Sequence, residues 1–276
     1  MSGEPILPLA EDPGLRTRPL VFVGDLAAPE LDDGDRHHLE RVLRLAPGDL
    51  VTVADGHGNW RPCRLGSTLE PMGEVRHQPP PGPPLTVAFT PVKAVRPEWV
   101  VQKLTEVGVD RIVPVLTERS VVRWDDERWR RRIGPKLATT VTEACAQSRR
   151  LHRPTVEAPR SLTHFLAASG PVASGPVGSG PVAPDLSGAT DGCRVVLADP
   201  GGGPLPAGIT TIVVGPEGGF SPAERRLALT AGLPGAVLRA ETAAVVAGAV
   251  LVGLRAGQLA APATFPFRPG RGQVSP

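Results

Sequence analysis

The segment best suited to hold a ligand is TTIVVGPEGGFSPAE, residues 210–224. Residues 211–214 are β-favouring and apolar, which predicts a short buried strand. A glycine-rich stretch follows at 215–219, and Ser221 and Glu224 then form a capping-box pattern that starts a helix. Such an elbow leaves backbone N–H groups bare, with no Cβ to block close approach. A tight turn without a ligand explains the same glycines, so both interpretations stay open at this point.

A second segment adds charged side chains. Residues 236–238, Ala-Val-Leu, are predicted to form another buried strand, followed by Arg-Ala-Glu-Thr-Ala at 239–243. Arginine is rarely placed at a buried edge without an anionic partner, so Arg239 is expected to contact Glu217, Glu241 or a bound carboxylate. The alternatives are a fixed ion pair for Arg239, an exposed turn position for Glu217, and a first-turn carboxylate offsetting the helix dipole for Glu241.

The order of these segments resembles the RsmE-type methyltransferases of the SPOUT class. The shared features are the GPEGG elbow, a helix opening with S-P-x-E, a short strand, the LR-x-ET-A segment and a helix of small residues. The resemblance implies an α/β C-terminal domain folded as a trefoil knot that binds S-adenosylmethionine. Periodicity alone does not indicate a knot, because knots are nearly absent among protein folds.

The resemblance assigns the cofactor pocket to the loops after three strands, predicted to end at Leu197, Val214 and Leu238. The carboxyl ends of parallel strands meet at one edge of a sheet, so these loops are expected to converge. The expected cofactor-binding residues are Leu197, Asp199, Gly215, Pro216, Glu217, Gly218, Gly219, Leu238, Arg239, Glu241, Thr242 and Ala243.

The resemblance also implies the methyl acceptor, N3 of one uridine in small-subunit (16S) ribosomal RNA. That atom lies on the Watson–Crick edge, so the base must be unpaired or flipped out. Neutral N3 carries a proton, so the protein must supply orientation, desolvation and a proton acceptor, and no metal is expected. The candidate catalytic residues are Arg239 (through a water that it holds), Glu217 and Glu241.

The first part of the chain has the pattern of a small β-domain. Residues 1–19 are expected to be a flexible arm, and strands are predicted at 20–23, 50–53 and 60–65, with a helical turn over 35–44. The HHLERVLR block, followed by PGD and DG, matches the first block of the RsmE family. The resemblance therefore implies that residues 20–78 are a PUA-like, RNA-binding module.

The remainder of the chain alternates strands and helices. The prolines of residues 79–84 predict a semi-rigid linker, and the alternation over 85–261 predicts a parallel sheet covered by helices on both faces. Within it, Ser-Gly-Pro-Val occurs three times in residues 169–184, which predicts a disordered insertion because nothing there can fill a core. Residues 262–276 are expected to be a flexible tail.

Several basic side chains and one histidine are the expected RNA contacts, although a net charge of +2 does not by itself predict a nucleic-acid partner. Lys103 could instead pair with Glu106 on the same helix, and His38 could be a partly buried helix histidine. Arg149 stands where the family usually has glycine. The expected RNA-binding residues are His38, Arg41, Arg44, Lys93, Lys103, Arg119, Arg149 and Arg150.

Composition restricts the remaining classes of function. The three cysteines are far apart without a C-x-x-C pair, which predicts buried thiols rather than a zinc site or disulfides. The chain has no signal-peptide pattern and no membrane-length apolar run, so a cytoplasmic protein is expected.

Residues 243–254 are apolar on nearly every face and must be buried in the core or between subunits. The resemblance places this helix at a two-fold homodimer interface.

The sequence therefore predicts a two-domain methyltransferase acting on naked small-subunit ribosomal RNA or on the assembled 30S subunit. One alternative is an inactive RNA-binding or ribosome-assembly factor with the same fold, which the intact glycine elbow and LR-x-ET-A segment disfavour. The other is a SPOUT methyltransferase acting on transfer RNA, which the HHLERVLR block disfavours.

Overall fold

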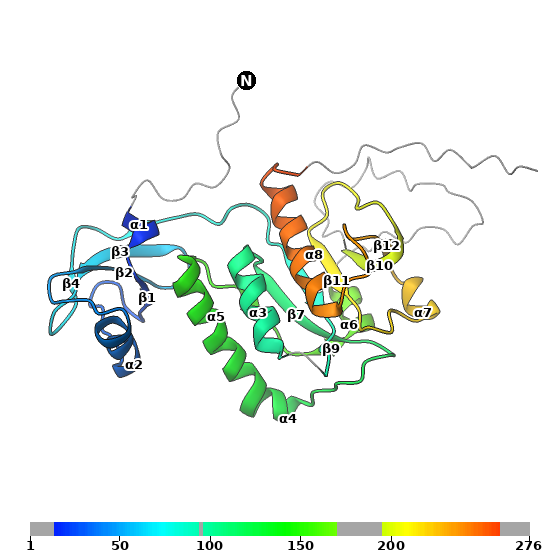
Figure 1. Cartoon of the computed structure of the whole chain (residues 1–276), viewed down its shortest axis with the longest axis horizontal. Helices are drawn as coiled ribbons and strands as arrows, with labels where there is room; N and C mark the ends of the chain where they lie inside the picture. The colour runs from blue at the N-terminus through cyan, green and yellow to red at the C-terminus, as the bar shows by residue number, and fades with distance from the viewer. Residues whose placement is uncertain (1–13, 94–95, 170–194, 260–276) are drawn as a thin grey trace, which may run out of the picture.

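Two β-sheets organise the chain, each with its own helices (Figure 1). The computed structural model describes residues 14–93, 96–169 and 195–259. Residues 1–13 of the expected arm, the Ser-Gly-Pro-Val insertion beyond Ser169 and the tail lie outside these residues.

The N-terminal sheet has five strands, with β1 parallel to β2 and β2 antiparallel to β3. The chain reverses between β2 and β3 at Asp55-Gly56, where Gly56 has a φ of +87°. Alternate residues of β2, Val51 and Val53, point into a core that Leu39 closes from the helical segment. The predicted strands of this small domain are confirmed. The elements are β1 Leu20–Phe22, α2 Asp33–His37, a π-helical turn at His38–Val42, β2 Leu50–Ala54, β3 Asn59–Arg64, β4 Glu70–Pro71 and β5 Arg76–His77.

The second sheet has seven strands in the order β12-β10-β11-β6-β7-β8, with β9 also paired to β7. Every pair is parallel, as the alternation of strands and helices predicts. Pro114 does not interrupt β7, because it pairs with Phe89 in the register of the strand. The strands are β6 Thr86–Phe89, β7 Arg111–Leu116, β8 Thr155–Val156, β9 Arg160–Ser161, β10 Val195–Gly203, β11 Thr211–Val214 and β12 Leu229–Ala231.

Helices cover both faces of this sheet, which confirms the expected three-layer arrangement. Val87 belongs to the apolar cluster shared with α3, α5 and α8, whereas its neighbour Ala88 packs on the opposite face with Phe165 of α6. The alternation follows from the pleat, since successive side chains point to opposite faces. The helices are α1 Gly14–Thr17, α3 Pro97–Val107, α4 Asp126–Arg128, α5 Gly134–Ser148, α6 Leu162–Ala168, α7 Pro222–Arg225 and α8 Ala240–Arg255, with a π-helical turn at Trp129–Ile133.

The strand predicted at 236–238 is wrong. These residues form an irregular loop, in which the Val237 side chain is 85% exposed. The third strand at this edge is β12, which pairs in parallel with β10. The two backbones approach so closely that a Cβ on Gly202 would lie 2.5 Å from the Ala231 nitrogen. A short run of three residues cannot show whether a neighbouring strand is available for pairing. The sequence therefore did not show that residues 229–231, and not 236–238, form the strand.

Part of the expected N-terminal arm is ordered. Residues 14–17 form α1, whose Leu15 side chain is 1% exposed. Leu15 packs with Leu20 and Trp60 of the small domain and with Leu151, which follows α5. This cluster joins the two domains, because it contains side chains from both.

Arg149 ends α5 in a left-handed conformation, with φ 59° and ψ 32°. This is the position where helices favour glycine, because a Cβ there costs about 1–2 kcal/mol. Arg149→Gly is therefore expected to raise the free energy of unfolding by about 0.5–1 kcal/mol, the gain being reduced by the greater entropy of glycine in the unfolded chain. Urea unfolding measures this change, with Arg149→Ala as the control that keeps the strained conformation. A loss of stability in the glycine variant would contradict the explanation by backbone strain.

Candidate functional site

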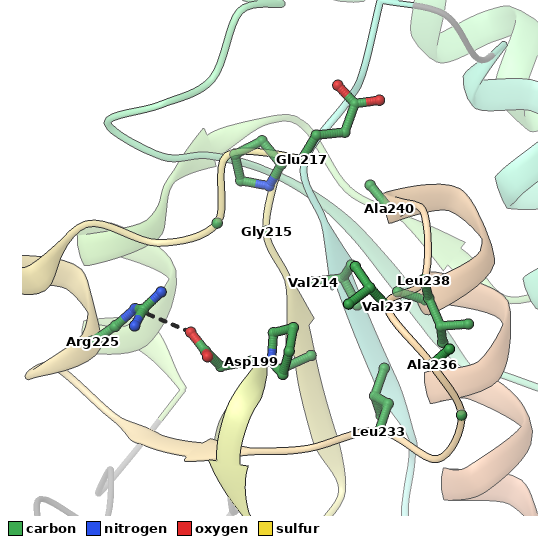
Figure 2. A pocket seen from close by; sticks show the side chains of 16 residues that line it. Asp199, Val214, Gly215, Glu217, Arg225, Leu233, Ala236, Val237, Leu238 and Ala240 are labelled. Carbon is green, nitrogen blue, oxygen red and sulfur yellow. Dashed lines mark ion pairs between the residues drawn. The ribbon is translucent and has the colours of Figure 1, made fainter.

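A cavity of about 390 Å³ lies at the carboxyl edge of the seven-stranded sheet (Figure 2). Its walls come from residues 198–200 in the middle of β10, the 215–219 loop after β11, and the 233–238 loop that leads into α8. The volume lies within the range of roughly 300–1,000 Å³ typical of small-molecule sites. Three segments distant in sequence therefore form one pocket of ligand size.

The structure brings many of the predicted cofactor residues to this cavity. Those that line it are Asp199, Gly215, Pro216, Glu217, Gly219, Leu238 and Ala243.

The other predicted cofactor residues do not line it. Leu197 is buried on the face of the sheet that α6 covers, where it packs in one cluster with Phe165. Gly218 is exposed, and its carbonyl accepts a hydrogen bond from Arg119 Nη1 at 2.6 Å. Arg239 and Thr242 are exposed at the start of α8, and Glu241 lines a smaller neighbouring cavity.

Sequence reasoning missed several lining residues because it assigned the last loop to a strand. Leu233, Gly235, Ala236 and Val237 all line the cavity. Gly235 has a φ of +114°, a conformation that side chains with a Cβ rarely adopt. The Pro234-Gly235 dipeptide was the available signal, since that pair marks a turn.

The loop after β11 is held tightly in place. The Gly219 N–H donates to the Pro216 carbonyl at 2.7 Å, and Gly219 has a φ of +67°. The predicted capping box of α7 is confirmed: Ser221 Oγ accepts from the Glu224 N–H at 3.2 Å, and Glu224 Oε2 accepts from the Ser221 N–H at 2.8 Å. Glu224 Oε1 also accepts from the Glu118 N–H at 2.8 Å. The buried Glu224 carboxylate therefore fixes this loop to the segment that follows β7.

Asp199 supplies a buried negative charge to the cavity wall. Its side chain is 7% exposed, and Oδ2 lies 3.0 Å from Arg225 Nε (Figure 2). Oδ1 accepts a hydrogen bond from the Gly201 N–H at 3.0 Å. The polar lining is thus held in a fixed orientation before any ligand binds.

The three predicted catalytic residues lie around this cavity without contacting one another. Arg239 is the exposed N-cap of α8, and no strand directly precedes it. Its guanidinium forms no ion pair within the described chain, so the expected contact with Glu217 or Glu241 and the alternative of a fixed ion pair are both wrong, whereas a contact with a bound carboxylate stays a prediction. Glu217 lies at the rim, and Figure 2 shows its carboxylate pointing away from Asp199 and Leu238. Glu241 lies in the first turn of α8, with Oε2 buried.

Most of the predicted RNA-binding residues are at the surface. His38, Arg41 and Arg44 are exposed on or just after the π-helical turn, and Lys93 and Arg119 are exposed in loops. Arg149 is half-buried and lines a groove between α5 and the small domain.

Lys103 and Arg150 form ion pairs within the chain. Lys103 Nζ lies 2.8 Å from Glu106 Oε2, which is the alternative pairing on one helix. Arg150 Nη2 lies 2.8 Å from Asp110 Oδ1, and Arg150 Nη1 donates to the Val109 carbonyl at 2.6 Å. The expected RNA contact of Arg150 is therefore corrected: its guanidinium, in a side chain that is only 14% exposed, ties the end of α5 to the residues that follow α3.

Two of the predicted buried thiols are confirmed. Cys63 and Cys145 are free and buried, and burial raises the pKa of the Cys145 thiol to about 11. Cys193 lies outside the described residues. No cluster of His, Cys, Asp and Glu within the described residues could hold a metal ion. The described helices include none with the length and apolar character needed to cross a membrane.

Comparison with known families matches both domains. Residues 79–252 match the model of an RNA methyltransferase domain, and residues 31–68 match that of an RNA methyltransferase PUA domain. The expected PUA-like character of the small domain is thereby confirmed.

Two curated relatives are both named ribosomal RNA small subunit methyltransferase E. The chain is 32% identical over 234 residues to ribosomal RNA small subunit methyltransferase E of Synechocystis sp., an alignment covering 80% of this chain and 71% of that protein. It is 31% identical to the protein of the same name from Mycobacterium bovis, with 82% and 87% coverage.

Solved structures share the architecture. Ribosomal RNA small subunit methyltransferase E from Neisseria gonorrhoeae, bound to S-adenosyl methionine, is 26% identical with a TM-score of 0.62 and covers 86% of this chain and 98% of its own. A probable rRNA-methyltransferase from Porphyromonas gingivalis, 24% identical, gives a TM-score of 0.66 with 87% and 100% coverage and shows the same fold. The predicted α/β fold with a parallel sheet is confirmed, and the knot stays a prediction.

Proposed function

The chain belongs to the RNA methyltransferase family that includes ribosomal RNA small subunit methyltransferase E, and from that premise we propose that it methylates N3 of one uridine in small-subunit (16S) ribosomal RNA. The methyl donor is S-adenosylmethionine. The observation that carries the proposal is the cavity formed by the GPEGG loop, the middle of β10 and the start of α8. This activity belongs in the cytoplasm, because ribosomal subunits are its substrate.

The cavity fits S-adenosylmethionine in size and chemistry. Gly215 and Gly219 offer main-chain groups without side chains, and a Cβ on Gly215 would lie 3.0 Å from the Phe220 ring. Leu238 and Ala243 supply apolar walls, and the Asp199 carboxylate can accept hydrogen bonds from hydroxyl groups. When bound, the cofactor supplies a methyl group on a positively charged sulfur.

The chain's own residues have three tasks in this reaction. The loops around the cavity exclude water and hold the reacting groups in line, which replaces a bimolecular encounter by an oriented one. Exposed basic residues of the PUA-like domain and of the loops after β6 and β7, such as Arg41, Lys93 and Arg119, contact the RNA backbone. A carboxylate near the start of α8 removes the N3 proton, since the proton must leave before N3 can bond to carbon.

α8 is proposed to form the core of a two-fold dimer. Val245, Val246 and Val252 are only partly buried within the chain, and Ala249 is exposed. An apolar helix with uncovered faces gains stability from burial against a second copy. Light scattering should give the mass of a dimer, and a monomer at micromolar concentration would contradict this arrangement.

The choice of RNA can be tested by comparing possible acceptors one at a time. The protein and labelled S-adenosylmethionine are incubated in four separate samples, each with one acceptor: 30S subunits, naked 16S ribosomal RNA, 50S subunits or transfer RNA. Label is expected only in the 30S or 16S samples. Label in transfer RNA would favour the transfer-RNA enzyme, and no label together with no cofactor binding in calorimetry would favour an inactive assembly factor.

A further inference from the structure

A second, much smaller cavity lies between the end of β6 and the start of α8. Its volume is about 10 Å³, and it shares Ala240 as a wall with the large cavity. Its polar lining consists of Thr90, directly after β6, and Glu241, in the first turn of α8. The other lining side chains are apolar and come from β6, the loop after it, α3 and Ala240.

Both polar residues present a buried oxygen that lacks a partner. Thr90 Oγ1 and Glu241 Oε2 are each buried, and neither has a hydrogen bond within the described part of the chain. Thr90 is 2% exposed, and its backbone N–H donates to the Val214 carbonyl at 2.9 Å. This bond places Thr90 at the sheet edge beside Val214, which directly precedes Gly215 of the large cavity.

The size of the cavity and the missing partners fit one water molecule. Buried polar atoms almost always have a hydrogen-bond partner, either protein or ordered water. A water needs a cavity of about 10–15 Å³ and at least two polar partners. The small cavity has that volume, and a water in it can accept from the Thr90 hydroxyl and donate to the Glu241 carboxylate.

We infer that a single water bridges Thr90 Oγ1 and Glu241 Oε2 and orients the Glu241 carboxylate as the acceptor of the uridine N3 proton. Thr90 is then a positioning residue and Glu241 the catalytic base. The inference rests on the proposed function and names the proton acceptor within it. Glu217 is disfavoured for this role, because its exposed carboxylate points away from the cavity (Figure 2).

The proton and electrons balance in this scheme. The N3–H bond breaks and its proton goes to the Glu241 carboxylate. The electron pair left on N3 forms the bond to the methyl carbon, and the pair of the broken carbon–sulfur bond remains on the departing sulfur. The Glu241 carboxylic acid then releases its proton to water, which restores the base.

The test compares Thr90→Val, which removes the hydroxyl at nearly constant shape, with Thr90→Ser, which keeps it. Single-turnover methylation of 30S subunits at saturating cofactor should slow at least tenfold in the valine variant and less than threefold in the serine variant. Glu241→Gln should slow the reaction by about 10²–10⁴-fold, the usual contribution of a general base. Calorimetric affinity for S-adenosylmethionine should stay within twofold of the wild-type value in all three variants.

A crystal structure of the wild-type protein without ligands provides a readout independent of activity. One ordered water should lie within hydrogen-bond distance of both Thr90 Oγ1 and Glu241 Oε2. A dry cavity, a wild-type rate in Thr90→Val, or equal losses in the valine and serine variants would each overturn the inference. Absence of methylation by the wild-type protein itself would instead overturn the proposed function, and the bridging water would still be decided by the structure.

Discussion

Glu224→Ala is expected to lower the free energy of unfolding by about 2–6 kcal/mol. The Glu224 side chain accepts hydrogen bonds from the backbone N–H groups of Glu118 and Ser221, and the residue is 4% exposed. Alanine leaves the buried Ser221 N–H and the part-buried Glu118 N–H without partners, at about 1–3 kcal/mol each, and the first of these losses breaks the capping box of α7. Urea unfolding followed by circular dichroism measures the loss.

Two variants serve as controls for this prediction. Glu224→Gln keeps one acceptor oxygen and should lose roughly half as much stability, since only one of the two donors is left without an acceptor. Glu217→Ala removes an exposed carboxylate from the same loop and should change stability by less than about 0.5 kcal/mol. A loss below about 1 kcal/mol in Glu224→Ala would contradict the role of this carboxylate as the tie between the two loops.

Arg239→Ala is expected to reduce the rate of methyl transfer by at least about 100-fold while the protein stays folded, a loss of the size seen when a group stabilising developing charge is removed. The guanidinium is exposed at the N-cap of α8, beside the cavity, and no carboxylate of the described chain pairs with it. It is therefore available to the negative charge that develops on the uridine or to a phosphate of the RNA. Single-turnover kinetics with 30S subunits measures the effect.

The matched control is Arg226→Ala, which removes an exposed arginine at the end of α7 that does not line the cavity. Its rate should stay within threefold of wild type. Thermal unfolding of both variants should match the wild-type protein, because exposed substitutions of this kind change stability by less than about 0.5 kcal/mol. A wild-type rate in Arg239→Ala would remove this residue from the mechanism.

The sequence alone predicted those parts of the structure that are determined by residues close together in the chain. Ser221 and Glu224 are spaced as a capping box, and that spacing alone locates the start of α7. Gly108 ends α3 with a φ of +110°, as its position after a helical pattern predicts. The glycine elbow was located for the same reason, because the residues that define it are neighbours in the chain.

The sequence alone did not predict those parts of the structure that depend on contacts between residues far apart in the chain. Residues 236–238 carry a strand-like pattern but pair with no strand, whereas β12 at Leu229–Ala231 pairs with β10. Arg150 has the charge of an RNA contact, yet Asp110 lies 2.8 Å away and removes it from the surface. The cavity of Thr90 and Glu241 joins residues far apart in the sequence, and no spacing rule indicates it.

The most direct test of the account is to locate the methyl group on the RNA. The wild-type protein is incubated with 30S subunits and isotopically labelled S-adenosylmethionine, and the 16S ribosomal RNA is digested to nucleosides and to fragments for mass spectrometry. Labelled 3-methyluridine is expected at a single position, approaching one methyl group per subunit. Label on a ribose hydroxyl, on a carbon of the base or on any nucleotide other than uridine would contradict it.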